Sequence, residues 1–175
     1  VAVKVHKSNT VHKEVIAEIC KEARFMRHYR HPNVIKFYGV AVERDPLMLV
    51  MELVIGGALD SLLRKKKDEF SLQDLLYFAY TASKGLEYLH DNACIHRDDL
   101  KQRLPIRWLA PEVMTTATYS TKSDVFSFGV LLWEIYSGGE MPYKGMTAAE
   151  VNAKIRMALE GLLEGKRTVS LRDIT

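Results

Sequence analysis

Two charged side chains near the start of the sequence are placed to form an ion pair. Lys4 ends the alternating segment Val1-Ala2-Val3-Lys4, which is typical of a strand. Glu22 lies three residues after Ile19 and four before Met26, at the margin of a helix face that would pack on a sheet. A partly buried carboxylate is costly unless it is paired, and Lys4 is placed to pair with it. For either residue taken singly, an edge lysine or a solvated glutamate is the open alternative.

A second candidate, Asp98, ends the triplet His96-Arg97-Asp98. Cys94-Ile95 gives the triplet a short apolar lead-in, so the aspartate would emerge on a loop. A charged surface turn is the open alternative, because the tripeptide is specific only together with other motifs. A helical pattern precedes it, carried by Leu75, Ala79, Ala82, Leu86 and Leu89.

The composition is that of one soluble globular domain. The chain has 175 residues, 47% hydrophobic and 27% charged, with a formal net charge of +3. Basic and acidic residues are interspersed. The basic run 64–67 adjoins Asp68 and Glu69, which is more typical of a solvated helix end than of a nucleic-acid patch. We therefore expect no nucleic-acid partner.

The sequence indicates neither a disulfide framework nor a membrane anchor. Cys20 and Cys94 lack the spacing of a disulfide scaffold or a zinc site, which favours a reducing compartment, and we expect a cytoplasmic protein. The most apolar segment, Val125–Tyr136, is shorter than the roughly 20 residues that span a bilayer, and it contains Glu134. We expect it to be a buried helix. The sequence opens without an initiator methionine or a secretory signal, as a cut through a domain would.

The pattern along the chain predicts a small antiparallel sheet with one helix, followed by a mainly helical half. Strands are predicted at 1–5, 34–42 and 47–54, with a turn at 43–46 between the last two. Helices are predicted after Gly56-Gly57 at 58–66, 72–91, 123–136 and from 148 to about 164. Strands first and helices afterwards predict two lobes. The helix between the first two strands is predicted from Val15, Ile19, Ala23 and Met26.

Several short segments, in order along the chain, closely resemble the protein kinase family. They are Val1–Lys4, Glu22–Gly39, Met51-Glu52-Leu53, His96–Asp98, Pro105–Glu112 and Ser123–Gly129. Pro105-Ile106-Arg107-Trp108 ahead of Ala110-Pro111-Glu112 resembles the tyrosine-kinase branch, and residues 48–54 and 64–69 are similar to the non-receptor Fes/Fer group.

This resemblance implies an α+β, two-lobed protein kinase-like fold that is incomplete. Residues 1–155 would form a partial kinase domain, with 1–54 in the sheet lobe and 55–155 in the helical lobe. Residues 156–175 would be a divergent tail.

On the nucleotide side, the resemblance implies that Lys4 would hold the α- and β-phosphates of ATP and that Glu22 would orient Lys4. Fixed positive charge suits phosphates that stay anionic throughout the reaction. The residues beside adenine would be Met51, Glu52, Leu53 and Val54.

On the acceptor side, the resemblance implies that Asp98 would accept the proton of the substrate hydroxyl. Pro105 and Trp108 would belong to the shelf beneath the acceptor tyrosine. Asp124 would brace the backbone of the 96–98 triplet, and a plain helix N-cap is its open alternative.

The sequence departs from the family where the metal ligands should lie. Arg103 stands in place of the expected asparagine and would bring positive charge to a cation site, and Asp-Phe-Gly occurs nowhere in the chain. No metal-binding residues are therefore predicted. Only eleven residues separate Asp98 from Ala110, so we infer a junction after Asp98. The glycine-rich phosphate loop does not precede Lys4, and the family pattern ends beyond Ile155.

We therefore expect a protein tyrosine kinase domain. An intact family member would transfer the γ-phosphoryl group of ATP, with magnesium, to protein tyrosine; this chain should show negligible transfer, because the metal site and phosphate loop are lost together. The alternatives are a pseudokinase, which binds a partner or competes with an active homologue, and a non-functional fragment. The apolar helix predicted at 123–136 favours a protein partner that covers exposed apolar surface.

Overall fold

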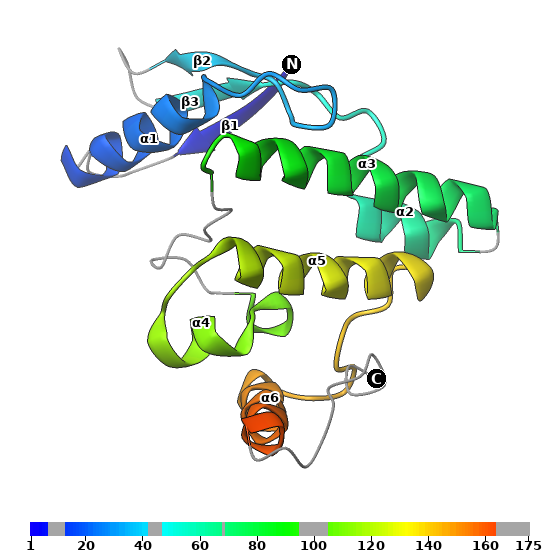
Figure 1. The fold of residues 1–175 in the computed structure, drawn as a ribbon. Helices are drawn as coiled ribbons and strands as arrows, with labels where there is room; N and C mark the ends of the chain where they lie inside the picture. The colour runs from blue at the N-terminus through cyan, green and yellow to red at the C-terminus, as the bar shows by residue number, and fades with distance from the viewer. Residues whose placement is uncertain (7–12, 42–46, 68, 95–104, 164–175) are drawn as a thin grey trace.

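The computed structural model describes residues 1–6, 13–41, 47–67, 69–94 and 105–163. A three-stranded sheet and one helix form one part of the fold, and helices form the rest (Figure 1). This architecture confirms the α+β fold class predicted from the sequence. The elements are β1 (Ala2–His6), α1 (Lys13–Met26), β2 (Phe37–Ala41), β3 (Leu47–Met51), α2 (Leu59–Lys65), α3 (Leu72–Asp91), the 3₁₀ helix η1 (Ile106–Trp108), α4 (Pro111–Thr116), α5 (Thr121–Tyr136) and α6 (Ala148–Leu163).

The strands pair antiparallel in the order β1-β3-β2. Side chains alternate between the two faces of a strand, so Leu47 and Leu49 of β3 share one face. Both are buried, at 3% and 0% exposure, and α1 packs on β2 and β3. Lys4 is the register partner of Leu49, so it projects from this same face. The turn predicted at 43–46 lies outside the described residues.

The opposite face of the sheet is also apolar. Val3 pairs with Val50 and Val5 pairs with Met48 across the β1–β3 ladder. Val3 and Val5 are 45% and 44% exposed, so aliphatic surface on this face meets solvent.

The two long helices of the second part, α3 and α5, contact one another (Figure 1). Each begins at a capping box, in which two residues exchange side-chain to backbone hydrogen bonds. Ser71 and Asp74 do so at the start of α3, and Ser120 and Ser123 at the start of α5. These caps explain why both helices begin where their apolar periodicity begins.

The loop that follows α1 lies against α3. The backbone N–H of Arg30 donates to the hydroxyl of Tyr88 at 3.0 Å, and the His31 ring stacks on the Tyr88 ring with centroids 4.8 Å apart. A Cβ atom built on Gly85 would lie 2.7 Å from the carbonyl oxygen of Asn33. Glycine is therefore required at position 85 for the loop to approach the helix this closely.

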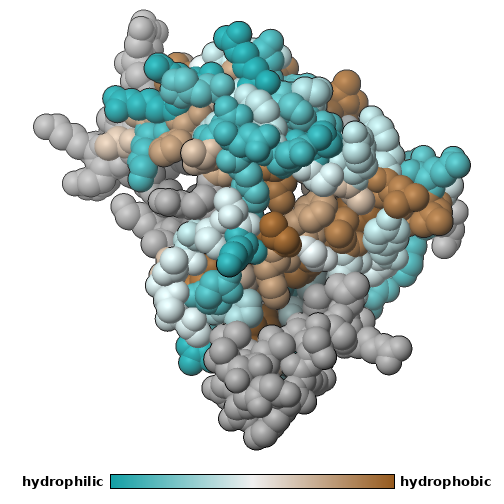
Figure 2. Space-filling model, in the orientation of Figure 1, coloured by the Kyte–Doolittle hydropathy of each residue, from teal (hydrophilic) through white to brown (hydrophobic). Residues whose placement is uncertain are grey.

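Apolar side chains also reach the surface of the helical part. In Figure 2 they gather in the middle of the visible face and toward the right-hand end of α3. Leu72 and Leu76, in the first turns of α3, are 65% and 51% exposed. The helix α5 buries Val130 and Ile135 but exposes Val125 by 58%. Among the described residues, no helix is both long and apolar enough to cross a membrane.

Candidate functional site

Lys4 and Glu22 come from two elements that the sheet part brings together. Lys4 lies in the middle of β1 with an exposed side chain, on the face that also carries Leu49. Glu22 lies on α1 beside the buried Ala23. The helix and the sheet are thus assembled as the sequence predicts, while the pairing of the two side chains stays a prediction.

The segment that follows β3 is held by hydrogen bonds at Glu52, and the two residues after Glu52 are exposed to solvent. The N–H of Glu52 donates to the Lys36 carbonyl at 2.8 Å, and the Glu52 carboxylate accepts from the Lys36 N–H at 3.1 Å. Leu53 and Val54 are 55% and 50% exposed. Met51 ends the strand on the same sheet face as Lys4, because it pairs with Ala2 in the same ladder. A ligand on this face could therefore reach both Lys4 and the strand exit.

The start of α5 is tied to the end of α3. His90 Nε2 lies 2.9 Å from Asp124 Oδ2, and Asp124 is only 6% exposed. The N-cap of α5 is Ser120, so the N-cap alternative for Asp124 is wrong. The bracing role of Asp124 toward the 96–98 triplet stays a prediction, and Asp98 itself lies outside the described residues.

The shelf residues Pro105 and Trp108 lie at the two ends of η1 and are held against α5. Trp108 donates its indole N–H to Glu134 Oε2 at 3.1 Å. The Trp108 carbonyl accepts from the Ser127 hydroxyl at 2.7 Å. Ile106 and Trp108 also pack against a core cluster from α5, α6 and the turn between them. The members of that cluster are Val130, Tyr143, Val151 and Ile155.

Arg107, between these two apolar residues, reaches the turn that connects α5 to α6. One terminal nitrogen donates to the carbonyls of Pro142 and Tyr143, both at 2.7 Å, and the other to the carbonyl of Met146 at 2.5 Å. Arg107 was part of the Pro105–Trp108 motif in the sequence, but no role was predicted for it. Its partners are backbone atoms, which leave no side-chain signature in a sequence.

Glu134 is a buried carboxylate at the back of the shelf. It is 8% exposed, and burial raises its pKa above the usual range, while the hydrogen bond from Trp108 partly opposes that shift. Its place in an otherwise apolar helix was visible in the sequence. A lone carboxylate in such a helix requires a polar partner, and the structure supplies Trp108.

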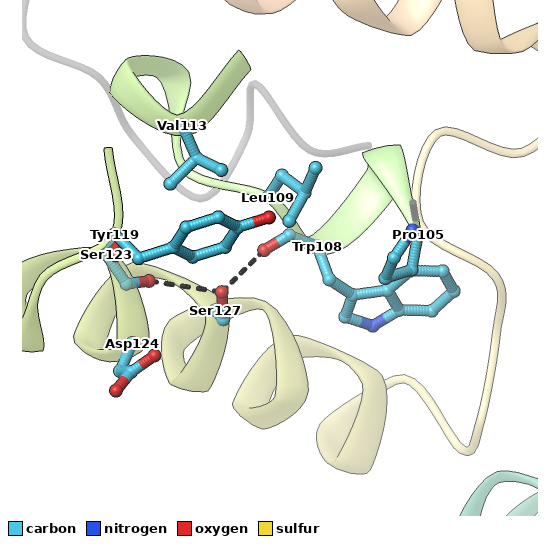
Figure 3. Close-up of a pocket in the computed structure, with 8 residues that line it drawn as sticks. All are labelled: Pro105, Trp108, Leu109, Val113, Tyr119, Ser123, Asp124 and Ser127. Atoms are coloured by element: carbon cyan, nitrogen blue, oxygen red, sulfur yellow. Dashed lines mark hydrogen bonds between the residues drawn. The ribbon is translucent and has the colours of Figure 1, made fainter. Parts of the chain in front are cut away.

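A cavity of about 410 Å³ opens beside the shelf, between η1, α4 and α5. Figure 3 shows the Tyr119 ring between Val113 and the serines of α5, and Ser127 bonded to the Trp108 carbonyl. Its walls are mainly apolar with a few polar groups, which is the usual composition of a ligand pocket. The lining residues are Pro105, Trp108, Leu109, Val113, Tyr119, Ser123, Asp124 and Ser127.

The residues that the structure describes do not form a magnesium site. Magnesium prefers carboxylate and other oxygen ligands. Within the described ranges, no three His, Cys, Asp or Glu side chains cluster in a way that could hold a metal ion. The sequence also carries Arg103 where the kinase pattern has asparagine, and it has no Asp-Phe-Gly.

In the comparison with known proteins, the chain matches one family in two parts, which meet near the junction predicted after Asp98. The sequence model of the family described as protein tyrosine and serine/threonine kinase matches residues 1–103 and 98–164. The chain belongs to this protein kinase family. The two matches meet at 98–103, where the kinase pattern lacks its metal-binding segment. The predicted junction after Asp98 falls within this overlap.

The kinases most similar to this chain include members of the Fer and Fps group. Human tyrosine-protein kinase Fer is 37% identical over 188 residues, an alignment that covers 89% of this chain and 23% of Fer. Fer-related kinase 1 of Caenorhabditis elegans is 40% identical over 185 residues, covering 89% of this chain and 47% of that protein. The transforming protein Fps of avian sarcoma virus (strain PRCII) is 34% identical over 184 residues, which cover 86% of this chain and 34% of Fps. The resemblance to tyrosine kinases of the Fes/Fer group is thereby confirmed.

These alignments also show how much of each relative the chain covers. This chain spans about a quarter of human Fer and about half of the worm kinase. The alignment with Fer extends over 188 residues, more than the 175 of the whole chain. It therefore includes positions that Fer has and this kinase chain lacks.

Proposed function

We propose that this chain is a protein tyrosine kinase domain that keeps an acceptor-side surface and has lost metal-dependent phosphoryl transfer. In this proposal residues 1–54 and 55–155 are its two lobes. The observation that carries the proposal is a contrast within the helical lobe. The shelf at 105–108 is braced by hydrogen bonds to α5 and to the α5–α6 turn, while the metal ligands of the family are missing from the sequence.

Loss of transfer follows from the electrostatics of the reaction. Magnesium in kinases bridges phosphate oxygens and neutralises charge that develops during transfer. Removing a single preorganised electrostatic group commonly costs about 10²- to 10³-fold in rate. Here both metal ligands are absent together, and Arg103 adds a positive charge in their place. Phosphorylation by this chain should therefore be negligible even if Asp98 is correctly placed.

The acceptor side supports a binding role. Pro105 and Trp108 would lie beneath the phenol of a tyrosine in a protein substrate. Their backbone is anchored by contacts to later segments of the chain, so the shelf does not depend on the missing metal-binding segment. A surface of this kind suits a module that occupies tyrosine-containing segments and competes with an active kinase for them.

The chain could bind ATP even though it does not transfer the phosphoryl group. Lys4 and the strand exit at Met51 share one face of the sheet, which supports a site for the phosphates and adenine of ATP. The proposed adenine contacts come from the backbone of Glu52 to Val54, and Glu22 is the proposed partner of Lys4. Bound ATP would supply the phosphoryl group, but without a metal site we expect it to act as a ligand only.

Three measurements on the purified chain test this function. The first is the thermal-unfolding midpoint with and without ATP and magnesium, for the wild type and for Lys4→Met. The second is radiolabel transfer from ATP to a random copolymer of glutamate and tyrosine. The third is binding of that copolymer compared with polyglutamate of equal length, which separates recognition of tyrosine from attraction of an acidic polymer to a chain of net charge +3.

We expect cooperative unfolding, no measurable transfer, and tighter binding of the tyrosine-containing copolymer than of polyglutamate. A rise in the midpoint with ATP that Lys4→Met abolishes would locate the nucleotide site. Transfer above background would refute the proposed loss of activity. Equal binding of both polymers would refute the acceptor-side role, and a non-cooperative transition would identify a fragment without a stable fold.

A further inference from the structure

The turn between α5 and α6 has a backbone that needs external support. Within residues 142–146 of this turn, Tyr143 has φ of 53° and Gly145 has φ of 83°, so this part contains two left-handed residues, one of which is not glycine. Left-handed conformations of non-glycine residues persist only where surrounding contacts hold them. Tyr143 is 4% exposed and belongs to the core cluster that also receives Ile106 and Trp108.

Three carbonyl oxygens of this turn converge on the guanidinium of Arg107. The donors are its two terminal nitrogens, and the acceptors are Pro142, Tyr143 and Met146. Pro142 is fully buried and Arg107 is half-buried, so the hydrogen bonds form where water competes little. Hydrogen bonds from a charged donor in such a place are about twice as strong as neutral ones.

The same residue lies in the middle of the shelf. Arg107 is preceded by Ile106 and followed by Trp108, and both of these pack into the core cluster. Successive side chains of η1 thus hold the backbone of the shelf from different sides. Among these three side chains, Arg107 is the one that hydrogen-bonds to the carbonyls of the turn.

We propose that Arg107 is a positioning residue, which fixes the acceptor shelf of Pro105 and Trp108 to the 142–146 turn and so sets how the chain binds tyrosine-containing segments. The inference rests on the proposed acceptor-side function. Arg107 acts through the shelf backbone and the turn, and its guanidinium, already committed to three carbonyls, is not the group that contacts the bound segment.

A lysine cannot replace Arg107 in this role. The guanidinium is a planar fork whose two nitrogens reach different carbonyls at once. An ammonium group keeps the charge but presents its donors from a single point, so it cannot serve carbonyls that are spread over residues 142–146. Charge alone would be preserved in Arg107→Lys, and geometry would be lost.

The test compares Arg107→Lys and Arg107→Gln with Leu63→Ala in the intact chain. Leu63 is a buried residue of α2 that packs beside Gly139, upstream of residues 142–146, so its truncation destabilises the same part of the fold and leaves Arg107 and its three acceptors in place. Binding of the glutamate–tyrosine copolymer and of polyglutamate is measured at a temperature where all variants are folded. The indole N–H resonance of Trp108, assigned with a Trp133→Phe variant, reports on the shelf.

We expect both Arg107 variants to lose the tyrosine-dependent part of binding by about tenfold or more, because each breaks hydrogen bonds from a charged donor that hold the shelf backbone. The Trp108 resonance should shift in both, and Leu63→Ala should change neither quantity. If the Arg107 variants bind tyrosine like the wild type, or lose no more than Leu63→Ala, the positioning role is wrong. Should Arg107→Gln fail to fold, Arg107→Lys decides alone. Absence of tyrosine-dependent binding by the wild type would instead overturn the proposed function.

Discussion

His90 Nε2 and Asp124 Oδ2 lie 2.9 Å apart and join the last turn of α3 to the first turn of α5. The two residues are 34 positions apart in the chain, and the side chains of both are largely buried, at 19% and 6% exposure. A hydrogen bond between a carboxylate and an imidazole in such a place fixes the relative position of two helices that together form the centre of the helical lobe.

Replacing Asp124 with asparagine should destabilise the protein by about 1.5–3 kcal/mol, the usual contribution of a hydrogen bond to a charged group. The amide keeps the shape of the side chain but removes the charge that His90 contacts. Urea denaturation of Asp124→Asn measures the loss. Asp91→Asn is the matched control, because Asp91 is exposed at the end of the same helix. Equal effects of the two variants would show that the buried bond contributes nothing specific.

Two helical glycines should respond oppositely to the same substitution. Gly85→Ala places a Cβ atom 2.7 Å from the backbone oxygen of Asn33, so we expect a loss of about 1–3 kcal/mol from overpacking. Gly129→Ala in α5 meets no atom within 4 Å, and should stabilise the protein by about 0.5–1 kcal/mol through helix propensity. Thermal unfolding of both variants checks the prediction. A gain for Gly85→Ala would mean that the loop after α1 can move away from α3 at no cost.

Gly139 and Gly145, in the α5–α6 connection, allow the steric cost of an added Cβ to be compared with the cost of its backbone conformation. Gly139 has φ of 77°, and an added Cβ would lie 2.6 Å from the Asp60 carbonyl oxygen. Gly145 has φ of 83°, but a Cβ there would meet open space. Gly145→Ala should therefore cost about 1 kcal/mol, and Gly139→Ala about 2–4 kcal/mol, because the steric term adds to the backbone term. Chemical denaturation ranks the two, and the reverse order would contradict the close packing of residue 139 on α2.

The raised pKa of Glu134 predicts that the stability of the protein depends on pH. A carboxyl group whose pKa is higher in the folded state binds protons more tightly there, so its contribution to stability is present at low pH and is lost as pH rises through the folded pKa. Glu134→Gln keeps an acceptor for Trp108 but cannot ionise. The variant should be more stable than the wild type at pH 7, and it should lose that advantage as pH falls through the raised pKa of Glu134 toward 4.5, the ordinary value for glutamate.

Denaturation midpoints from pH 4 to pH 8 measure the effect. Glu112→Gln, at an exposed position of α4, is the matched control for the substitution of glutamate by glutamine. A Glu134→Gln variant that is less stable than the wild type at every pH would show that the charged bond to Trp108 outweighs burial.

Most of the long elements could be predicted from the sequence. The helix α3 spans 72–91 as expected, because a capping serine precedes a sustained apolar period. The strand predicted at 34–42 is shorter in the structure, at Phe37–Ala41. The short helices η1 and α4 were not predicted. They contain three and six residues, too few to show a period, and η1 is held by tertiary contacts of Arg107 and Trp108.

The candidate site could be predicted only in part. The motifs located the shelf and Lys4 through family resemblance, since each motif is short and local. The bonds from Arg107 to carbonyls of the 142–146 turn hold the shelf, and the contact of His90 with Asp124 holds α3 to α5, each across more than thirty residues. Such pairs leave no local pattern. Glu134 was the exception, because a charged residue in an apolar helix is itself a signal.

The contacts of η1 have a consequence for the order in which the protein can form. The hydrogen bonds of Arg107 and Trp108 with α5 and the α5–α6 turn join η1 to partners later in the chain, the farthest 39 residues on. During synthesis, this part of the protein can therefore close on itself once residue 146 has left the ribosome. It requires no residue of the sheet for those bonds. The contacts of η1 with α5 and the α5–α6 turn can thus form late in synthesis and independently of the sheet.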